Sequence, residues 1–134
     1  MAEPDCPTTF FSKTYDEAFA LLVEARNYVA FEEAGDRAGL NFFQRLIVSC
    51  ETSRLTARIT HIMSWLLFQK AIFVGEIGRD AVWHDRYRLS GHEVCLGAIE
   101  PDHGALSPRL SNLMDRSRRL YVRVSRLDEM MARA

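Results

Sequence analysis

The chain has 134 residues, of which 48% are hydrophobic and 26% are charged, and its formal net charge is −1. These values fit one folded domain and exclude a chain that is disordered throughout. A net charge this close to zero also means that the molecule as a whole does not require a polyanionic partner.

The spacing of the cysteines and the length of the apolar segments indicate the cellular compartment in which the protein occurs. Cys6, Cys50 and Cys95 are widely spaced and form no CxxC pair, which is typical of a reducing environment. The N-terminal residues lack the basic and apolar regions of a signal peptide. The longest charge-free apolar stretch, residues 59–69, is too short to span a bilayer. We therefore expect a cytoplasmic protein that does not enter a membrane.

The first predicted helix covers residues 14–34. Thr14 and Glu17 have the T-x-x-E form of a capping box, which favours a helix start at this point. Behind them, apolar residues recur with the helical period, and Gly35 and Gly39 favour its end. This segment is acidic, because it carries Asp16, Glu17, Glu24, Glu32 and Glu33.

The second predicted helix covers residues 41–75, with Asn41 as its N-cap. No proline interrupts it, and at about 1.5 Å per residue it would form a rod of roughly 50 Å. Its apolar residues occupy two faces, one of which is defined by Leu55, Ile59, Ile62 and Leu66. A helix that is apolar over most of its circumference is buried from more than one side. This pattern predicts a central helix.

An irregular segment, residues 78–107, separates this rod from the third predicted helix at 108–133. The segment is rich in glycine and shows no sustained periodicity. Ser107 and Pro108 are suited to the N-cap and the first helical position. The third helix then carries an apolar seam with one polar member, in steps of three and four: Leu110, Leu113, Ser117, Leu120, Val124, Leu127 and Met131.

Together these elements predict a single all-α domain over residues 1–134, an antiparallel three-helix bundle with a long central helix and a long irregular loop before the third helix. The third helix is rich in arginine, so it either packs against the acidic first helix or offers a basic face to a partner. The aromatic end of the central helix needs cover, from the loop or from a second subunit. A twofold homodimer is the preferred interpretation.

The sequence offers little catalytic chemistry. Cys50 and His61 would lie about 16 Å apart on one helix, too far to act as a nucleophile and its base. No phosphate-binding loop or dinucleotide fingerprint occurs, and no G-x-S-x-G is present. We therefore expect a protein that is not an enzyme and that needs no cofactor or metal.

Three alternatives remain open. His84, His92, Cys95 and His103 are zinc-type ligands in the irregular segment, although their spacing matches no familiar module. The arginines of the third helix could follow a phosphate backbone, which would make the chain a helical nucleic-acid-binding dimer. A general protein-interaction dimer is the third interpretation.

The stretch SRLTARITHIMSWLLFQKAI, residues 53–72, places Arg54, Arg58 and His61 about one turn apart after Glu51. These residues could receive an acidic partner. They could equally form a polar seam between helices, with guanidinium groups bonded to Glu51 or to acids of the first helix.

Four segments, in order along the chain, resemble the RcdA family of alphaproteobacteria, named for the regulation of CtrA degradation. They are FFSKTYDEAFALLVEARNYV, then SCETSRLTARITHIMSWLLFQKA followed by GEIG, then RYRLSGHEVCLG, and finally SRRLYVRVSRLDEM. The similarity runs from Phe10 to Met131. It is strongest in the central helix, where ETSRLTAR precedes WLLFQK.

The resemblance implies a homodimeric adaptor of three-helix bundles that helps to deliver substrates such as CtrA to the ClpXP protease. Its implied partners are ClpX, a CpdR-like response regulator, a PopA-like effector that binds cyclic-di-GMP, and the protease substrates, and no nucleic acid or membrane. Exposure and periodicity, not the resemblance, select the candidate partner or dimer interface: Arg54, Arg58, His61, Trp65, Phe68, Arg116, Arg119, Leu120, Arg123, Val124 and Leu127.

Overall fold

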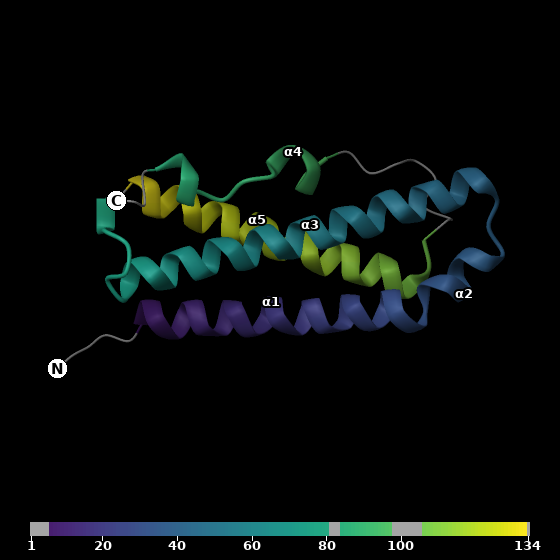
Figure 1. Cartoon of the computed structure of the whole chain (residues 1–134), viewed down its shortest axis with the longest axis horizontal. Coiled ribbons are helices and arrows are strands. Elements are labelled where there is room, and N and C mark those ends of the chain that lie inside the picture. Colours follow the sequence, from purple (N-terminus) through teal and green to yellow (C-terminus); the bar gives the residue numbers. More distant parts are fainter. Residues whose placement is uncertain (1–5, 81–83, 98–105, 134) are drawn as a thin grey trace.

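A computed structural model describes residues 6–80, 84–97 and 106–133, with backbone alone for residues 6–10. Three long helices, α1 (Cys6–Phe31), α3 (Phe42–Phe73) and α5 (Pro108–Arg133), lie side by side along the long axis (Figure 1). The short helix α2 (Glu33–Ala38) turns the chain between α1 and α3. No strand occurs among the described residues, so the all-α bundle with a long central helix is confirmed.

The helix α1 begins at Cys6, well before the predicted start near residue 14. Thr14 is a buried residue in the middle of the helix, so the predicted capping box was wrong. Pro7 lies in the first turn, where a missing N–H costs the helix nothing. Pro7 is therefore compatible with a helix that starts at Cys6.

The predicted N-caps of the other two long helices are confirmed. The Asn41 side chain accepts a hydrogen bond from the Gln44 N–H at 2.8 Å, and the Gln44 side chain accepts one from the Asn41 N–H at 3.1 Å. The Leu110 N–H donates to Ser107 Oγ at 3.2 Å. These bonds satisfy N–H groups that the first helical turn leaves unpaired.

The direction of α5 differs from the fully antiparallel bundle that the sequence predicts. Arg58 and Trp65 of α3 bond to residues near 114–117 and to Asp128, so residue numbers rise together and α3 and α5 run parallel. Arg116 and Arg123 bond to Glu24 and Glu17, so α5 is antiparallel to α1 (Figure 1). A connection of about thirty residues is long enough to return the chain along the bundle, so it does not force neighbouring helices to alternate.

The returning segment, residues 84–97, lies over α3 and α5 on the side away from α1 (Figure 1). We call it the strap. It contains the short 3₁₀ helix η2 (Asp85–Tyr87) and the single helical turn α4 (His92–Cys95). Only Leu89 and Cys95 of its side chains are buried.

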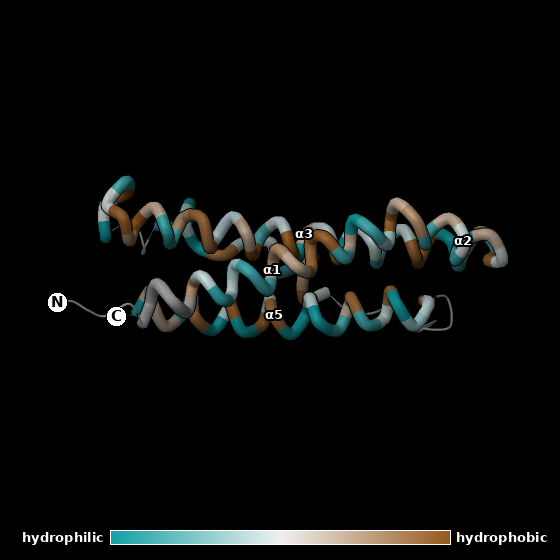
Figure 2. Tube along the Cα trace, turned by 90° about the horizontal axis from the view of Figure 1, so that it is seen from below, coloured by the Kyte–Doolittle hydropathy of each residue, from teal (hydrophilic) through white to brown (hydrophobic). Residues whose placement is uncertain are grey.

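The apolar core lies between the three long helices. The α5 tube alternates between hydrophilic and hydrophobic turns (Figure 2), and its seam residues Leu110, Leu113, Leu120 and Val124 are buried against the other two helices. On α1 the buried positions recur in steps of three and four: Ala18, Leu21, Ala25 and Tyr28. On α3 the buried residues fall on two sides, because α1 and the strap cover different faces.

Candidate functional site: the polar centre beneath the strap

Arg58 is the centre of a buried polar cluster between α3, α5 and the strap. Its side chain is 1% exposed and donates three hydrogen bonds: from Nε to the Cys95 carbonyl at 2.7 Å, and from one terminal nitrogen to the Met114 carbonyl at 3.0 Å and to Ser117 Oγ at 3.1 Å. Every one of these acceptors is neutral. The guanidinium thus joins three separate segments of the chain.

Burial lowers the pKa of Arg58 to about 10, and repulsion from neighbouring arginines adds to this effect. The side chain therefore remains charged at neutral pH. Glu51, also buried, partly offsets the shift by attraction. A charge held this deeply is stable only when all its neighbours are arranged around it, so Arg58 is a fixed structural cation.

Arg54 and His61 also bind the strap. Arg54 forms an ion pair with Glu51, as the sequence suggests, and its Nε donates to the Val94 carbonyl at 2.9 Å. His61 Nδ1 and Ser90 Oγ share a hydrogen bond of 3.0 Å. Arg54, Arg58 and His61 therefore lie close together, and all three bind the strap of the same chain.

The other end of the strap is fixed by Asp128. This buried carboxylate accepts one hydrogen bond from Trp65 Nε1 and another from Arg88 Nε, both at 2.9 Å. Close by, the Phe68 ring makes an edge contact with Tyr87. The aromatic end of the central helix is thus covered in part by the strap, which was one of the two covers that the sequence left open.

Tyr121 and Cys95 complete the cluster. The Tyr121 hydroxyl donates to the Ser90 carbonyl at 2.6 Å. Burial raises the pKa of Cys95 and that of Tyr121, so both groups stay protonated at neutral pH. A buried thiol in its neutral form is a poor nucleophile.

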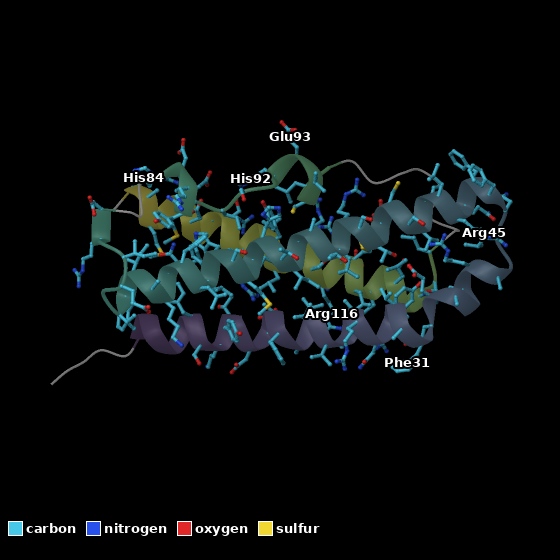
Figure 3. The ribbon with its side chains drawn as sticks, viewed as in Figure 1. Phe31, Arg45, His84, His92, Glu93 and Arg116 are labelled. Carbon is cyan, nitrogen blue, oxygen red and sulfur yellow. The ribbon has the colours of Figure 1, made fainter. Side chains whose placement is uncertain are left out.

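Two arginines of α5, Arg116 and Arg123, form ion pairs with acids of α1. Arg116 holds Glu24 through two bonds of 2.8 and 2.6 Å, between the two helices in Figure 3, and Arg123 pairs with Glu17. Leu120 and Val124 are buried inside the chain, and Leu127 packs against the same core. Arg119 is exposed and forms no ion pair within the described residues.

The sequence-selected residues thus include buried residues and residues that remain at least partly exposed. Arg58, Trp65, Leu120 and Val124 are internal contacts of one chain and cannot touch a partner while the bundle is closed. Arg54, His61, Phe68 and Leu127 are half-buried, and Arg116 and Arg123 are engaged by α1. Periodicity identifies a buried stripe but does not say which helix covers it.

The metal alternative concerns residues that the structure places apart. His84 contacts Tyr87, and His92 Nε2 lies 3.4 Å from Ser125 Oγ. In residues 6–80, 84–97 and 106–133, no three His, Cys, Asp or Glu side chains gather as metal ligands would. His103 lies outside the described residues.

The exposed apolar residues were not among the predicted sites. Four of them, Phe31, Phe42, Phe43 and Leu46, surround the turn from α1 into α3, and Phe31 and Phe42 are each 81% exposed. Phe31 is visible in Figure 3 at the end of α1, on the side away from the strap. We call these four residues the aromatic tip. The sequence does contain a signal for the aromatic tip. Phe42 and Phe43 directly follow the Asn41 cap, so they belong to the first turn of a helix, at the end of the bundle.

The fold and the polar centre define a helical-bundle protein in which a buried polar cluster holds the strap against α3 and α5. The family model described as "Protein of unknown function (DUF1465)" matches residues 2–134, and the chain belongs to that family. No curated protein matches it in sequence.

Among solved structures, the chain is similar to the crystal structure of RcdA from Caulobacter crescentus CB15, with 31% sequence identity and a TM-score of 0.73 over 92% of each chain. The resemblance to the RcdA family is thereby confirmed. None of the helices in the described ranges is long and apolar enough to cross a membrane.

Proposed function

We propose that this protein is an adaptor of regulated proteolysis, which helps to deliver substrates such as CtrA to the ClpXP protease. The observation that carries the proposal is the similarity to RcdA at 31% identity over 92% of both chains. The mechanism is an increase in the local concentration of substrate at the protease, through two binding sites on one rigid body. The partners would be ClpX, a CpdR-like response regulator and a PopA-like effector of cyclic-di-GMP.

The polar centre supports this proposal because it contributes to a rigid surface and not to a reaction. Arg58 and Asp128 each join helices to the strap, so the outer surface of the strap is held in one arrangement. A protein that works only by binding benefits from such preorganisation, since less ordering remains to be done on association.

The test is a degradation assay with purified ClpXP, the response regulator and a CtrA-type substrate. Substrate should disappear faster when the chain is added, and the tagged chain should retain ClpX or the response regulator on a column. An unchanged degradation rate together with no retention of either protein would remove the proposal. Duplex DNA binding measured across salt concentrations tests the nucleic-acid alternative, for which a steep loss of affinity with salt is diagnostic.

We also propose that two copies pair through the aromatic tip. Phe31, Phe42 and Phe43 are exposed aromatic side chains at the same end of the bundle, and such side chains are typical of a protein interface. In sedimentation, Phe42→Glu combined with Phe43→Glu should convert a dimer into a monomer. Met130→Glu, at an exposed apolar position on α5, is the matched control and should leave the dimer intact. A tip variant that sediments like the native protein would contradict this pairing.

A further inference from the structure

A second surface, distinct from both the strap and the aromatic tip, lies between α1 and α3. On α1, Tyr15, Phe19, Leu22, Arg26 and Val29 follow one another in steps of four and three, so they share one face. The rings of Tyr15 and Phe19 are stacked with their centres 6.3 Å apart. This face is apolar except for Arg26, and it is not covered by α5.

The facing side of α3 completes a groove. Tyr15 of α1, Leu67 and Lys70 of α3, and Val74 directly after α3 line one pocket of about 370 Å³. At the far end, Val29 of α1 and Arg45 of α3 line a second hollow together with four residues of α2: Glu33, Ala34, Arg37 and Ala38. Because α1 and α3 are antiparallel, the two hollows lie at opposite ends of the same side of this helix pair. We call the two hollows, together with the exposed face of α1 and α3 between them, the outer groove.

The middle of the outer groove is lined on α3 mainly by small side chains, and Arg37 of α2 donates a hydrogen bond to the first of them, Ser49, at 2.7 Å. Ser49, Thr52 and Thr56 of α3 fall between the two hollows, opposite the middle of α1. Their short side chains leave the larger side chains of α1 partly uncovered, since Leu22 is 39% exposed and Val29 is 45% exposed. Between Arg45 and Lys70 the charges of α3 are Glu51, Arg54 and Arg58, and all of these are directed towards the strap.

The charges at the borders of the groove are positive. Arg26, Arg45 and Lys70 form no ion pair with a carboxylate within the described ranges, in contrast to the arginines that α5 uses to hold α1. The one acid that lines the groove is Glu33, which is 4.0 Å from Arg37. The groove therefore combines an apolar floor with unpaired cations near both ends.

We propose that the outer groove binds an amphipathic helix of a partner protein, with an apolar face for the floor and carboxylates at both ends for the cations. Between Tyr15 and Val29 the floor is about 21 Å long at 1.5 Å per residue, which corresponds to about four turns of a docked helix. Charge complementarity selects an acidic ligand.

A second copy of this chain fits the groove poorly. Twofold pairing of the same face would place Arg26 and Arg45 of one copy beside Lys70 of the other, and like charges brought together in an interface cost binding energy. The groove and the aromatic tip are therefore assigned to different ligands. This inference rests on the proposed adaptor function for the identity of the ligand as a protein segment.

The test uses the full chain and two designed helical peptides with the same leucine face, one with glutamates at both ends and the other with lysines there. Fluorescence polarisation should show at least tenfold tighter binding of the glutamate peptide, with the difference shrinking at high salt, as expected for partly exposed charges. The charge-reversed variant with Arg26→Glu and Lys70→Glu should prefer the lysine peptide instead.

Matched variants locate the binding. Leu22→Glu and Leu67→Glu should each weaken the glutamate peptide at least tenfold, while Met130→Glu should not, and circular dichroism should show that all of them remain helical. The charge-reversed variant, which keeps the apolar floor, provides a second measurement if a leucine variant does not fold. Equal binding of the two peptides, binding of neither, or unchanged preference after charge reversal would overturn the proposal.

The result is also separable from the adaptor proposal. Peptide binding is measured without any protease, so a groove that binds the peptide in a chain that neither speeds degradation nor retains ClpX would sink only the adaptor function. A chain that delivers substrate but binds neither peptide would refute only the proposed ligand of the outer groove. Conversion of a dimer into a monomer by Leu22→Glu or Leu67→Glu, with no effect on peptide binding, would identify the groove as a contact between copies and overturn the inference.

Discussion

Replacement of Arg58 by Met tests the central role of this buried cation. Methionine has a similar length and no hydrogen-bond donor, so the variant removes three hydrogen bonds without opening a large cavity. A hydrogen bond from a charged donor contributes about 1.5 to 3 kcal/mol, and relief from burying the guanidinium offsets part of the loss. We expect a net loss of about 3 kcal/mol from these two opposing effects.

This loss converts into a change in Tm. With an unfolding entropy of roughly 2.1 cal/mol/K per residue, a chain of 134 residues should lose about 10 °C. Calorimetry measures this directly. Arg119→Met, at an exposed arginine on α5, is the matched control and should change Tm by no more than about 2 °C, which corresponds to about 0.5 kcal/mol.

A thiol-modification assay separates loosening of the strap from global unfolding. With Cys6 and Cys50 replaced by serine, the buried Cys95 reports the opening of the strap. Arg58 contributes one bond to the strap, worth about 2 kcal/mol, so the modification rate should rise roughly thirtyfold in the methionine variant. A higher Tm, or a Cys95 that remains as protected as in the native chain, would refute the role assigned to this cation.

Three further substitutions test other contacts. Gly91→Ala should cost about 1 to 3 kcal/mol, because Gly91 has a φ of 82° and an added methyl group would lie 2.5 Å from His61 Nε2. Asp128→Asn should cost about 1 to 2 kcal/mol in urea unfolding, because an amide can accept only one of the two N–H groups that the carboxylate now accepts. Glu24→Gln should cost about 0.5 kcal/mol at pH 7, because the side chain loses its charged pairing with α5.

The Glu24 effect should depend on pH with a defined sign. The hydrogen bonds from Arg116 lower the pKa of Glu24 below its usual value, so the folded state favours the ionised carboxylate. The stabilisation is present above the unfolded-state pKa of about 4.3 and is lost as pH falls through the lower folded-state pKa. The native protein and the glutamine variant should therefore converge in stability below pH 4; a gap that persists or widens there would contradict this assignment.

Control variants accompany the other two substitutions. Gly35→Ala, in the short helix α2 with open space around the added methyl group, should be neutral or slightly stabilising. If it lowers Tm as much as Gly91→Ala does, backbone strain at Gly91 is not the cause. Glu129→Gln, at the exposed neighbour of Asp128, should leave the urea midpoint unchanged, and equal losses from both changes would argue against a special role for the buried carboxylate.

The helices could be predicted from the sequence because their signals are local. The period of apolar residues identifies α3 and α5, and the Asn41 and Ser107 caps locate their starts within a few residues. The start of α1 was missed because Thr14 and Glu17 match a capping pattern that also occurs inside a helix. The direction of α5 was missed because it depends on the path of the strap, which no local pattern records.

The candidate site was harder to predict for a related reason. The spacing of Arg54 and Arg58 indicates a shared face, but their strap acceptors are the carbonyls of Val94 and Cys95, and every residue has a carbonyl. A carboxylate partner can be recognised in the sequence as an Asp or Glu, whereas a main-chain partner cannot be recognised from residue types. The burial of Leu120 and Val124 follows from their seam, yet the same seam would suit a helix of another subunit.

The use of main-chain acceptors has a consequence for how this protein tolerates change. The three side chains that hold the strap by its backbone, Arg54, Arg58 and Tyr121, do not read the identity of the residues they bind. The strap can therefore change its outward side chains freely, for example at the exposed Val94, without losing its position. The main-chain contacts that fix the strap can therefore stay the same while its exposed side chains change. New binding preferences can arise on the strap at little cost to the stability of the fold.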